Sequence, residues 1–282
     1  MSIVEHALDK ARGDRQPPAR SALRRRNDVA SVEEQRETRT PASHPQYRQL
    51  SYAREACETN RIFLPGTTVS EIGGADAAYR MLRTRVLQRV RTNKWSTLAI
   101  TSSGPLEGKS LTTLNLALSI ARDSNNQVFL IDLDMRHPSL CQNLGVEPEF
   151  EILNFFRGQV APQDTLFSIG LPNLAIAGSR NATEQASELL ASTRLEELLA
   201  YIKGVSPEAL TLIDMPPLLV TDEFLVIAPR VDATLLVVSE EVTKRESVSR
   251  ALQLLADFKL AGIVLNRTRE VLGSYYYGSA TD

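Results

Sequence analysis

The segment SSGPLEGKS, residues 102–110, lies between a short apolar run and a stretch with helical periodicity. In that position its backbone N–H groups and the first turn of the helix would face a bound anion. Lys109 supplies a mobile positive charge for the β- and γ-phosphates of a nucleotide, and the Ser110 hydroxyl is a ligand for Mg²⁺. The spacing therefore predicts a P-loop for ATP or a similar triphosphate, centred on Gly108, Lys109 and Ser110.

The usual G-x-x-x-x-G-K-S frame is altered in the first half of this loop. It places its first glycine at position 103, where this chain has Ser103. A non-glycine residue held in a left-handed conformation costs roughly 1–2 kcal/mol. We therefore expect modified backbone angles at Ser103 and Leu106 and a retained phosphate site. The residues predicted to contact the nucleotide are Ser103, Gly104, Pro105, Leu106, Glu107, Gly108, Lys109, Ser110 and Leu111.

Carboxylates stand where two further apolar runs end. Asp132 closes VFLID and Asp134 follows two residues later, while Asp214 closes LTLID before Pro216 and Pro217. Beside a triphosphate, such groups hold the waters of a metal ion or accept a proton from a hydroxyl. A strand-end aspartate that only caps a turn is the alternative for the first pair, whereas Asp214 has the form of a Walker B carboxylate. The predicted catalytic residues are Lys109, Asp132, Asp134 and Asp214, and the predicted Mg²⁺ ligands are Ser110, Asp132 and Asp214.

Short apolar runs alternate with amphipathic stretches from residue 97 onward. Continuous apolar strands separated by helices indicate a parallel sheet that is covered on both faces. Such sheets bind ligands outside the carboxyl ends of their strands, where the residues above lie. The sequence thus predicts an α/β fold with a mostly parallel central sheet. Strands are expected at 97–101, 128–132, 174–177, 210–214, 233–239 and 261–266, and helices at 75–91, 110–122, 188–202 and 246–258.

The composition limits the kinds of partner and compartment. The chain has 282 residues and a formal net charge of −2, which argues against capture of nucleic acid by overall charge. Cys57 and Cys141 form no CxxC pair, and the three histidines fall in no metal-ligand spacing. No apolar run approaches the roughly 18 residues needed to span a bilayer. We therefore expect a cytoplasmic protein with no nucleic-acid partner.

The chain divides by composition into three parts. Residues 1–60, rich in Arg, Glu, Gln, Pro and Ser, predict a largely disordered extension. Residues 61–272 hold the predicted ATP-binding domain, and residues 273–282 form a tail with SYYYG. Three successive tyrosines in a tail suit an exposed modification or contact site, with a small surface anchor as the alternative. The basic helix at 75–91 is either a solvated face or an interaction surface.

The order of these motifs resembles the bacterial tyrosine kinases of capsule and exopolysaccharide systems, a family of P-loop NTPases. The likeness runs from about residue 79 to residue 277 and includes D-x-D-x-R, I-D-x-P-P, YRMLRT and GIVLNR. It implies ATP-dependent autophosphorylation, with Asp132 the better candidate to activate the tyrosine hydroxyl. It also implies that Asn266 and Arg267 contact the base. The implied phosphate acceptors are Tyr275, Tyr276 and Tyr277.

Two departures from the family pattern stand out. Leu106 occupies a position that is usually glycine, and Ala77 replaces the glutamate of an E-x-x-R-x-x-R element linked to ring assembly, in which Arg80 and Arg83 are kept. Asp76 sits one position away, about 100° around the helix, and is a poor substitute.

The resemblance also implies partners. They are a membrane chain-length determinant (a polysaccharide co-polymerase) as a separate chain, a cognate phosphatase and a homo-oligomer, with recruitment to the inner face of the plasma membrane. Two other functions compete: a partition-type ATPase switch and a catalytically weakened ATP-binding regulator. The missing early lysine in Ser102-Ser103-Gly104 counts against the switch.

Overall fold

The computed structural model describes residues 47–64, 75–123, 126–240 and 242–268. Within them an eight-stranded sheet has the order β1-β4-β5-β3-β6-β2-β7-β8, and β8 pairs only with β7. All neighbours are parallel except β4 and β5, which confirms the predicted mostly parallel sheet. The strands are β1 (Arg48–Gln49), β2 (Thr97–Ser102), β3 (Val128–Asp132), β4 (Phe167–Ser168), β5 (Leu174–Ala177), β6 (Leu210–Asp214), β7 (Ala233–Ser239) and β8 (Leu260–Asn266).

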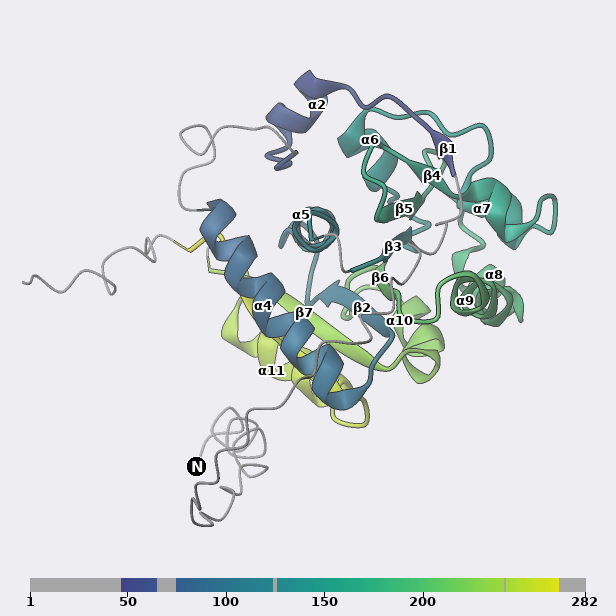
Figure 1. Cartoon of the computed structure of the whole chain (residues 1–282). Helices are drawn as coiled ribbons and strands as arrows, with labels where there is room; N and C mark the ends of the chain where they lie inside the picture. Colours follow the sequence, from purple (N-terminus) through teal and green to yellow (C-terminus); the bar gives the residue numbers. More distant parts are fainter. Residues whose placement is uncertain (1–46, 65–74, 124–125, 241, 269–282) are drawn as a thin grey trace, which may run out of the picture. The chain divides into compact units, whose positions relative to one another are not determined.

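Helices cover both faces of this sheet (Figure 1). The α-helices are α2 (Arg54–Thr59), α4 (Ala75–Asn93), α5 (Lys109–Ala121), α6 (Leu140–Leu144), α7 (Ile152–Phe156), α8 (Ala186–Ala191), α9 (Arg194–Val205), α10 (Glu223–Ile227) and α11 (Arg245–Leu254). Two 3₁₀ helices are η1 (Pro162–Thr165) and η2 (Ala228–Arg230). None of the described helices is long and apolar enough to cross a membrane.

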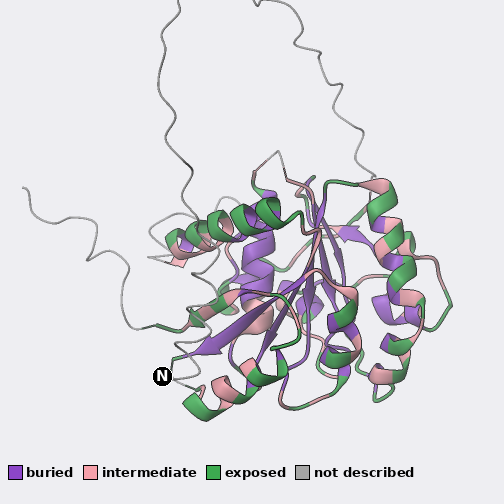
Figure 2. Cartoon of the chain, turned by 90° about the horizontal axis from the view of Figure 1, so that it is seen from below, coloured by how far each residue is buried: buried purple, intermediate pink, exposed green. Residues whose placement is uncertain are grey.

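Successive residues of a strand pack into two separate hydrophobic cores, because side chains alternate between the two faces of a sheet. Leu98 and Ile100 pack under α2, α4, α5 and α6, whereas Ala99 between them packs against the layer of α7 to α11. Figure 2 shows the strands as the buried centre between partly exposed helices. Both faces are therefore apolar, which explains the continuous apolar runs of the sequence.

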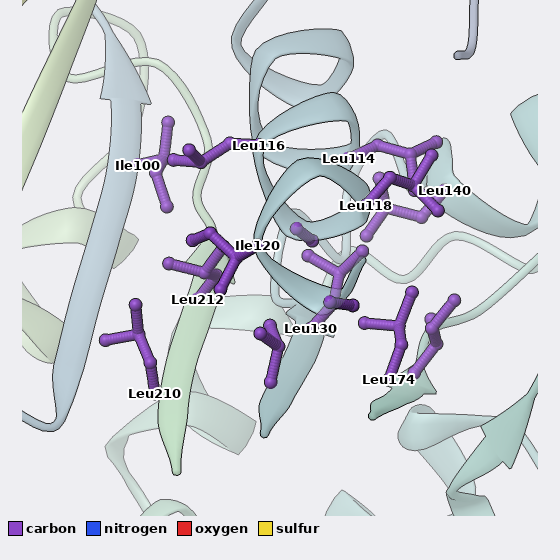
Figure 3. Close-up of a cluster of buried hydrophobic side chains, with 14 of the residues drawn as sticks. Ile100, Leu114, Leu116, Leu118, Ile120, Leu130, Leu140, Leu174, Leu210 and Leu212 are labelled. Carbon is purple, nitrogen blue, oxygen red and sulfur yellow. The ribbon is translucent and has the colours of Figure 1, made fainter. Parts of the chain in front are cut away.

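Helix α5 is the most deeply buried of the helices that touch the site. Leu114, Leu116, Leu118 and Ile120 are fully buried against β2, β3, β5 and β6 (Figure 3). Truncating one such leucine to alanine costs about 2–5 kcal/mol. This packing gives the first turn of α5, where the site residues lie, a rigid base.

Two predicted helices differ in the structure. The stretch 188–202 is split into α8 and α9, which are separated at Ser192 and Thr193. The guanidinium of Arg230 donates to the carbonyls of Leu190, Ala191 and Ser192, so a side chain satisfies the end of α8 that a continuous helix would satisfy itself. The stretch 246–258 ends earlier, because α11 stops at Leu254.

Residues 47–60, assigned by composition to the extension, are part of the folded sheet and its cover. Arg48 and Gln49 pair with Phe167 and Ser168 of β4, and the Cys57 side chain on α2 is fully buried in the core. A strand of two residues and a helix of six leave little periodicity to detect.

Candidate nucleotide site

The predicted phosphate loop joins the end of β2 to the start of α5. Gly108 is the N-cap with a left-handed φ of 88°, and Lys109 begins the helix. Leu106 is also left-handed, with a φ of 62°, and its side chain is 80% exposed. The expected change of backbone angle is therefore found at Leu106, while Ser103 is not left-handed.

A buried glutamate braces the loop from inside. The Glu107 carboxylate accepts hydrogen bonds from the Ser103 N–H (2.9 Å) and the Ser103 hydroxyl (2.8 Å). Gly104 is half-buried between them, and Pro105 is exposed. The sequence predicts that Glu107 contacts the nucleotide as part of the loop backbone. The hydrogen bonds of its side chain to Ser103 were not predictable from the sequence.

Lys109 turns toward two of the predicted carboxylates. Its Nζ lies 2.7 Å from Asp134 Oδ2 and 3.5 Å from Asp214 Oδ2, and it donates to Ser110 Oγ at 3.0 Å. Burial alone would lower the pKa of Lys109, but Asp214 and Asp134 outweigh it and raise the pKa above its ordinary value. The ammonium thus stays charged inside a nearly dry cluster.

Asp132 lies beside this cluster and faces the next helix. Its Oδ2 accepts the N–H groups of Ser139 (3.0 Å) and Leu140 (3.1 Å), the latter the first residue of α6, and its Oδ1 accepts the Asp134 N–H (3.1 Å). Burial, followed by the charge of Asp214, raises the pKa of Asp132 to about 7. The capping geometry considered for the first aspartate pair is therefore present at Asp132.

Asp214 stands opposite Asp132 in the sheet register. Its Oδ1 accepts a hydrogen bond from Thr113 Oγ1 (3.3 Å), a contact that the sequence analysis did not assign, while its Oδ2 is buried without a hydrogen-bond partner. Burial raises the pKa of this carboxyl. Asp214 Oδ2, whose described partner is the Lys109 ammonium at 3.5 Å, and the Ser110 hydroxyl are oxygen donors of the kind that Mg²⁺ takes, so the residues fit the metal.

The end of β8 reaches the same loop. Asn266 Nδ2 donates to the Glu107 carbonyl at 3.0 Å, and a Cβ placed on Gly108 would lie 2.1 Å from that nitrogen. Arg267 follows with an exposed side chain and a φ of 57°. Both residues, with Gly108 and half-buried Leu111, line one end of a groove.

Arg136 of D-x-D-x-R forms ion pairs with two glutamates that are distant in the sequence. It pairs with Glu223, at the start of α10, and with Glu184. The Glu223 side chain is 1% exposed, against 96% for Glu184. Sequence analysis matched Arg136 only as a motif residue; in the structure it pairs with the buried Glu223 carboxylate.

The ring-associated arginines are paired within the chain. Arg80 lies 3.4 Å from Asp76, which also meets Arg122 at 3.1 Å, and Arg83 donates to the Ser119 carbonyl. Asp76 thus pairs with Arg122 at the end of α5 as well as with Arg80 on its own helix. The predicted acceptors Tyr275, Tyr276 and Tyr277 lie outside the described residues.

Comparison with known proteins gives a consistent picture of relatives. No family model matches the chain. It is 27% identical over 190 residues to the tyrosine-protein kinase YwqD of Bacillus subtilis, covering 67% of this chain and 79% of the relative. It is also 27% identical over 200 residues to the tyrosine-protein kinase CpsD of Streptococcus agalactiae, covering 70% and 85%.

Solved structures agree with the sequence relatives. The kinase domain of the Escherichia coli tyrosine kinase ETK matches with a TM-score of 0.61 and 27% identity, covering 73% of this chain and 80% of that one. The VpsO kinase domain matches with a TM-score of 0.61 and 26% identity, covering 69% and 96%. By sequence and by fold, the chain is similar to the bacterial tyrosine kinases, and its fold is P-loop NTPase-like.

Proposed function

We propose that the chain is an ATP-dependent tyrosine autokinase that regulates capsule or exopolysaccharide polymerisation and export. It transfers the γ-phosphate of Mg-ATP to Tyr275, Tyr276 or Tyr277. The observation that carries the proposal is the buried Lys109 ammonium between Asp134 and Asp214, directly behind the left-handed Gly108. The relatives named as tyrosine-protein kinases support the same activity.

The first turn of α5 binds the triphosphate in this proposal. Its free N–H groups and those of the loop point at the phosphates, and Lys109 exchanges Asp134 for phosphate oxygens. Ser110 and Asp214 would hold Mg²⁺, assisted by Asp132, and Asn266 and Arg267 would flank the base. A metal ion held by these residues would supply positive charge that neutralises the phosphates.

Asp132 takes the phenolic proton in this proposal. The tyrosine oxygen forms a bond to the γ-phosphorus, the bond from that phosphorus to the ADP oxygen breaks, and ADP leaves with the electron pair. A carboxyl with a pKa of about 7 is matched to accepting a proton at neutral pH. Its Oδ1 accepts one described N–H and has a second lone pair available for the phenol.

The proposal extends to partners and place. The kinase acts in the cytoplasm as a homo-oligomer, at the inner face of the plasma membrane, docked on a chain-length determinant and reversed by a cognate phosphatase. The resemblance in motif order supports this part, and co-purification with the co-polymerase from membranes tests it.

Mass spectrometry of the purified chain after incubation with Mg-ATP tests the activity. Phosphate is expected on at least one of the three tail tyrosines, and Lys109→Met should reduce it by at least about 100-fold, because charge neutralisation dominates phosphoryl transfer. Lys203→Met, at an exposed position of α9, is the matched control and should leave the signal unchanged.

Replacing all three tail tyrosines by phenylalanine should remove the acceptor and preserve ATP binding. Lack of phosphotyrosine, even with the cytoplasmic segment of the membrane partner added, would refute the autokinase. Phosphate release with ATP-dependent dimerisation would then identify a switch ATPase instead.

A further inference from the structure

A groove of about 1180 Å³ runs between α4 and the edge strand β8. One end reaches Gly108 and Asn266 at the phosphate loop, and the other reaches Leu98 and Ala261, where β2 and β8 begin. Seven residues of β8 rise about 20 Å, so the groove extends well past the end that faces the nucleotide loop. The part next to Ala261 has no place in the proposed phosphoryl transfer.

The groove combines a basic lining with an apolar one. Among the residues that the structure describes, its lining holds four arginines, Arg61, Arg85, Arg89 and Arg267, and no carboxylate. The same groove is also lined by apolar residues, among them Met81, Trp95 and Ile263, the last 47% exposed.

Three of these four arginines have no described side-chain partner. Arg89 donates to the Ala261 carbonyl, whereas the guanidinium groups of Arg61, Arg85 and Arg267 have no hydrogen bond or ion pair with any described residue. Free guanidinium groups above an apolar floor suit an aromatic anion, since arginine binds phosphate bidentately while a ring packs below.

We propose that the phosphorylated tail, residues 269–282, folds back into this groove of its own chain. The inference rests on the proposed function for the origin of the phosphates. Thr268 lines the groove, and the seven residues from there to Tyr275 reach up to about 23 Å, enough to bring the tyrosines alongside Arg85 and Arg89.

Phosphorylation creates the charge match. Without phosphate the tail carries Arg269, Glu270 and Asp282. Each phosphotyrosine adds about −1.5 to −2 charges at neutral pH, opposite a lining whose described charged residues are all arginines. Strand β8 is an edge of the sheet within the described part of the chain, so it also offers backbone groups to an extended segment. Docking holds the modified tyrosines beside α4, so the tail is withdrawn from Lys109.

A binding experiment tests the groove without relying on kinase activity. A fluorescent synthetic peptide of residues 269–282, phosphorylated chemically at its three tyrosines, is titrated with full-length protein whose three tail tyrosines are phenylalanine. The phosphorylated peptide should bind at least about tenfold more tightly than the unphosphorylated one, and Arg85→Glu should weaken it about tenfold. Arg250→Glu, the same charge change at an exposed site on α11, should have no effect.

A second experiment tests docking within one chain. Phosphotyrosine is incorporated at position 276 of the full-length chain during translation, and hydrogen exchange is followed in α4 and β8. Slower exchange in both elements that is independent of protein concentration and lost in Arg85→Glu is the expected result.

Three results would overturn the proposal: equal binding of the two peptides, equal effects of the two arginine variants, or protection that appears only with dimers. Absence of autophosphorylation would refute the proposed function and leave both of these measurements interpretable, because their phosphates are installed by synthesis.

Discussion

The chain has two charged regions that meet at Gly108 and differ in how their charges are compensated. Around Lys109 the charges are buried and paired: Asp134 and Asp214 are 3% and 0% exposed. In the groove beside β8, Arg85 is exposed and has no described partner. Removing one partner from a paired, buried cluster costs much stability, and a ligand that enters the cluster must replace the contacts it breaks. An unpaired, exposed cation contributes little to stability, so its removal costs little.

The largest effect on stability is expected where a buried charge loses its partner. Arg136→Ala removes the cation beside Glu223, whose side chain is 1% exposed. Unfolding free energy should fall by about 3 kcal/mol, the low end for a broken buried pair, because Arg136 itself is partly exposed. Urea denaturation measures the change.

Glu184→Gln is the control for that variant. Glu184 is 96% exposed on the same arginine, so its removal should cost less than about 1 kcal/mol. Equal losses in the two variants would show that burial does not separate these pairs.

Asp132 makes the buried cluster sensitive to pH. Its pKa is about 7 in the folded chain against 3.8 for the free side chain, so between these values the folded state binds more protons than the unfolded state. Stability should therefore decline as pH rises from about 4 to about 7 and level off above, by linkage. Denaturation of the nucleotide-free protein across this range measures the slope.

The matched variants are Asp132→Asn, which should flatten part of that slope, and Asp257→Asn at an exposed position, which should not. An unchanged slope in Asp132→Asn would show that this carboxyl is ionised throughout the range.

At Leu106 the phosphate loop carries backbone strain on an uncharged, exposed residue. Leu106 is left-handed and 80% exposed, so Leu106→Gly relieves the backbone and exposes no core. The substitution should stabilise the chain by about 1 kcal/mol. Thermal unfolding measures it beside Leu225→Gly in α10, where the same change in a helix should destabilise by about 1 kcal/mol. Loss of stability in both variants would mean that Leu106 makes a contact that its exposure hides.

The smallest effect on stability is expected for a substitution in the groove. Arg85→Ala should change the unfolding free energy by less than about 0.5 kcal/mol, because no described group depends on Arg85. A loss comparable with that of Arg136→Ala, in the same denaturation assay, would erase the difference between the two regions.

Long elements with a continuous pattern were predictable. The strands at β2, β3, β6 and β7 and the helices α4 and α5 lie within one or two residues of their predicted bounds, because burial on both faces left uninterrupted apolar runs. The order of strand, loop and helix at residues 97–121 was also predictable, and it places Lys109 and Ser110 at the carboxyl end of the sheet.

What the sequence did not reveal depends on single side chains. The break between α8 and α9 is set by Arg230, which lies far along the chain. The orientation of Asp132 toward α6, in contrast to Asp134 toward Lys109, follows from which backbone N–H groups the loop presents. No local pattern encodes such contacts. The roles of the predicted site residues and of the tail tyrosines stay predictions.

The contact between Gly108 and Asn266 restricts which substitutions can be inherited together. Position 108 has no room for even a methyl group while the Asn266 amide rests on the Glu107 carbonyl. A residue larger than glycine at 108 would require the Asn266 amide to leave the Glu107 carbonyl, by moving aside or by substitution, and would also require tolerance of a left-handed backbone. Substitutions at the two positions, 158 residues apart, should therefore be coupled. Loss of the asparagine removes one of the two constraints on the glycine, while loss of the glycine breaks the hydrogen bond between Asn266 and the Glu107 carbonyl.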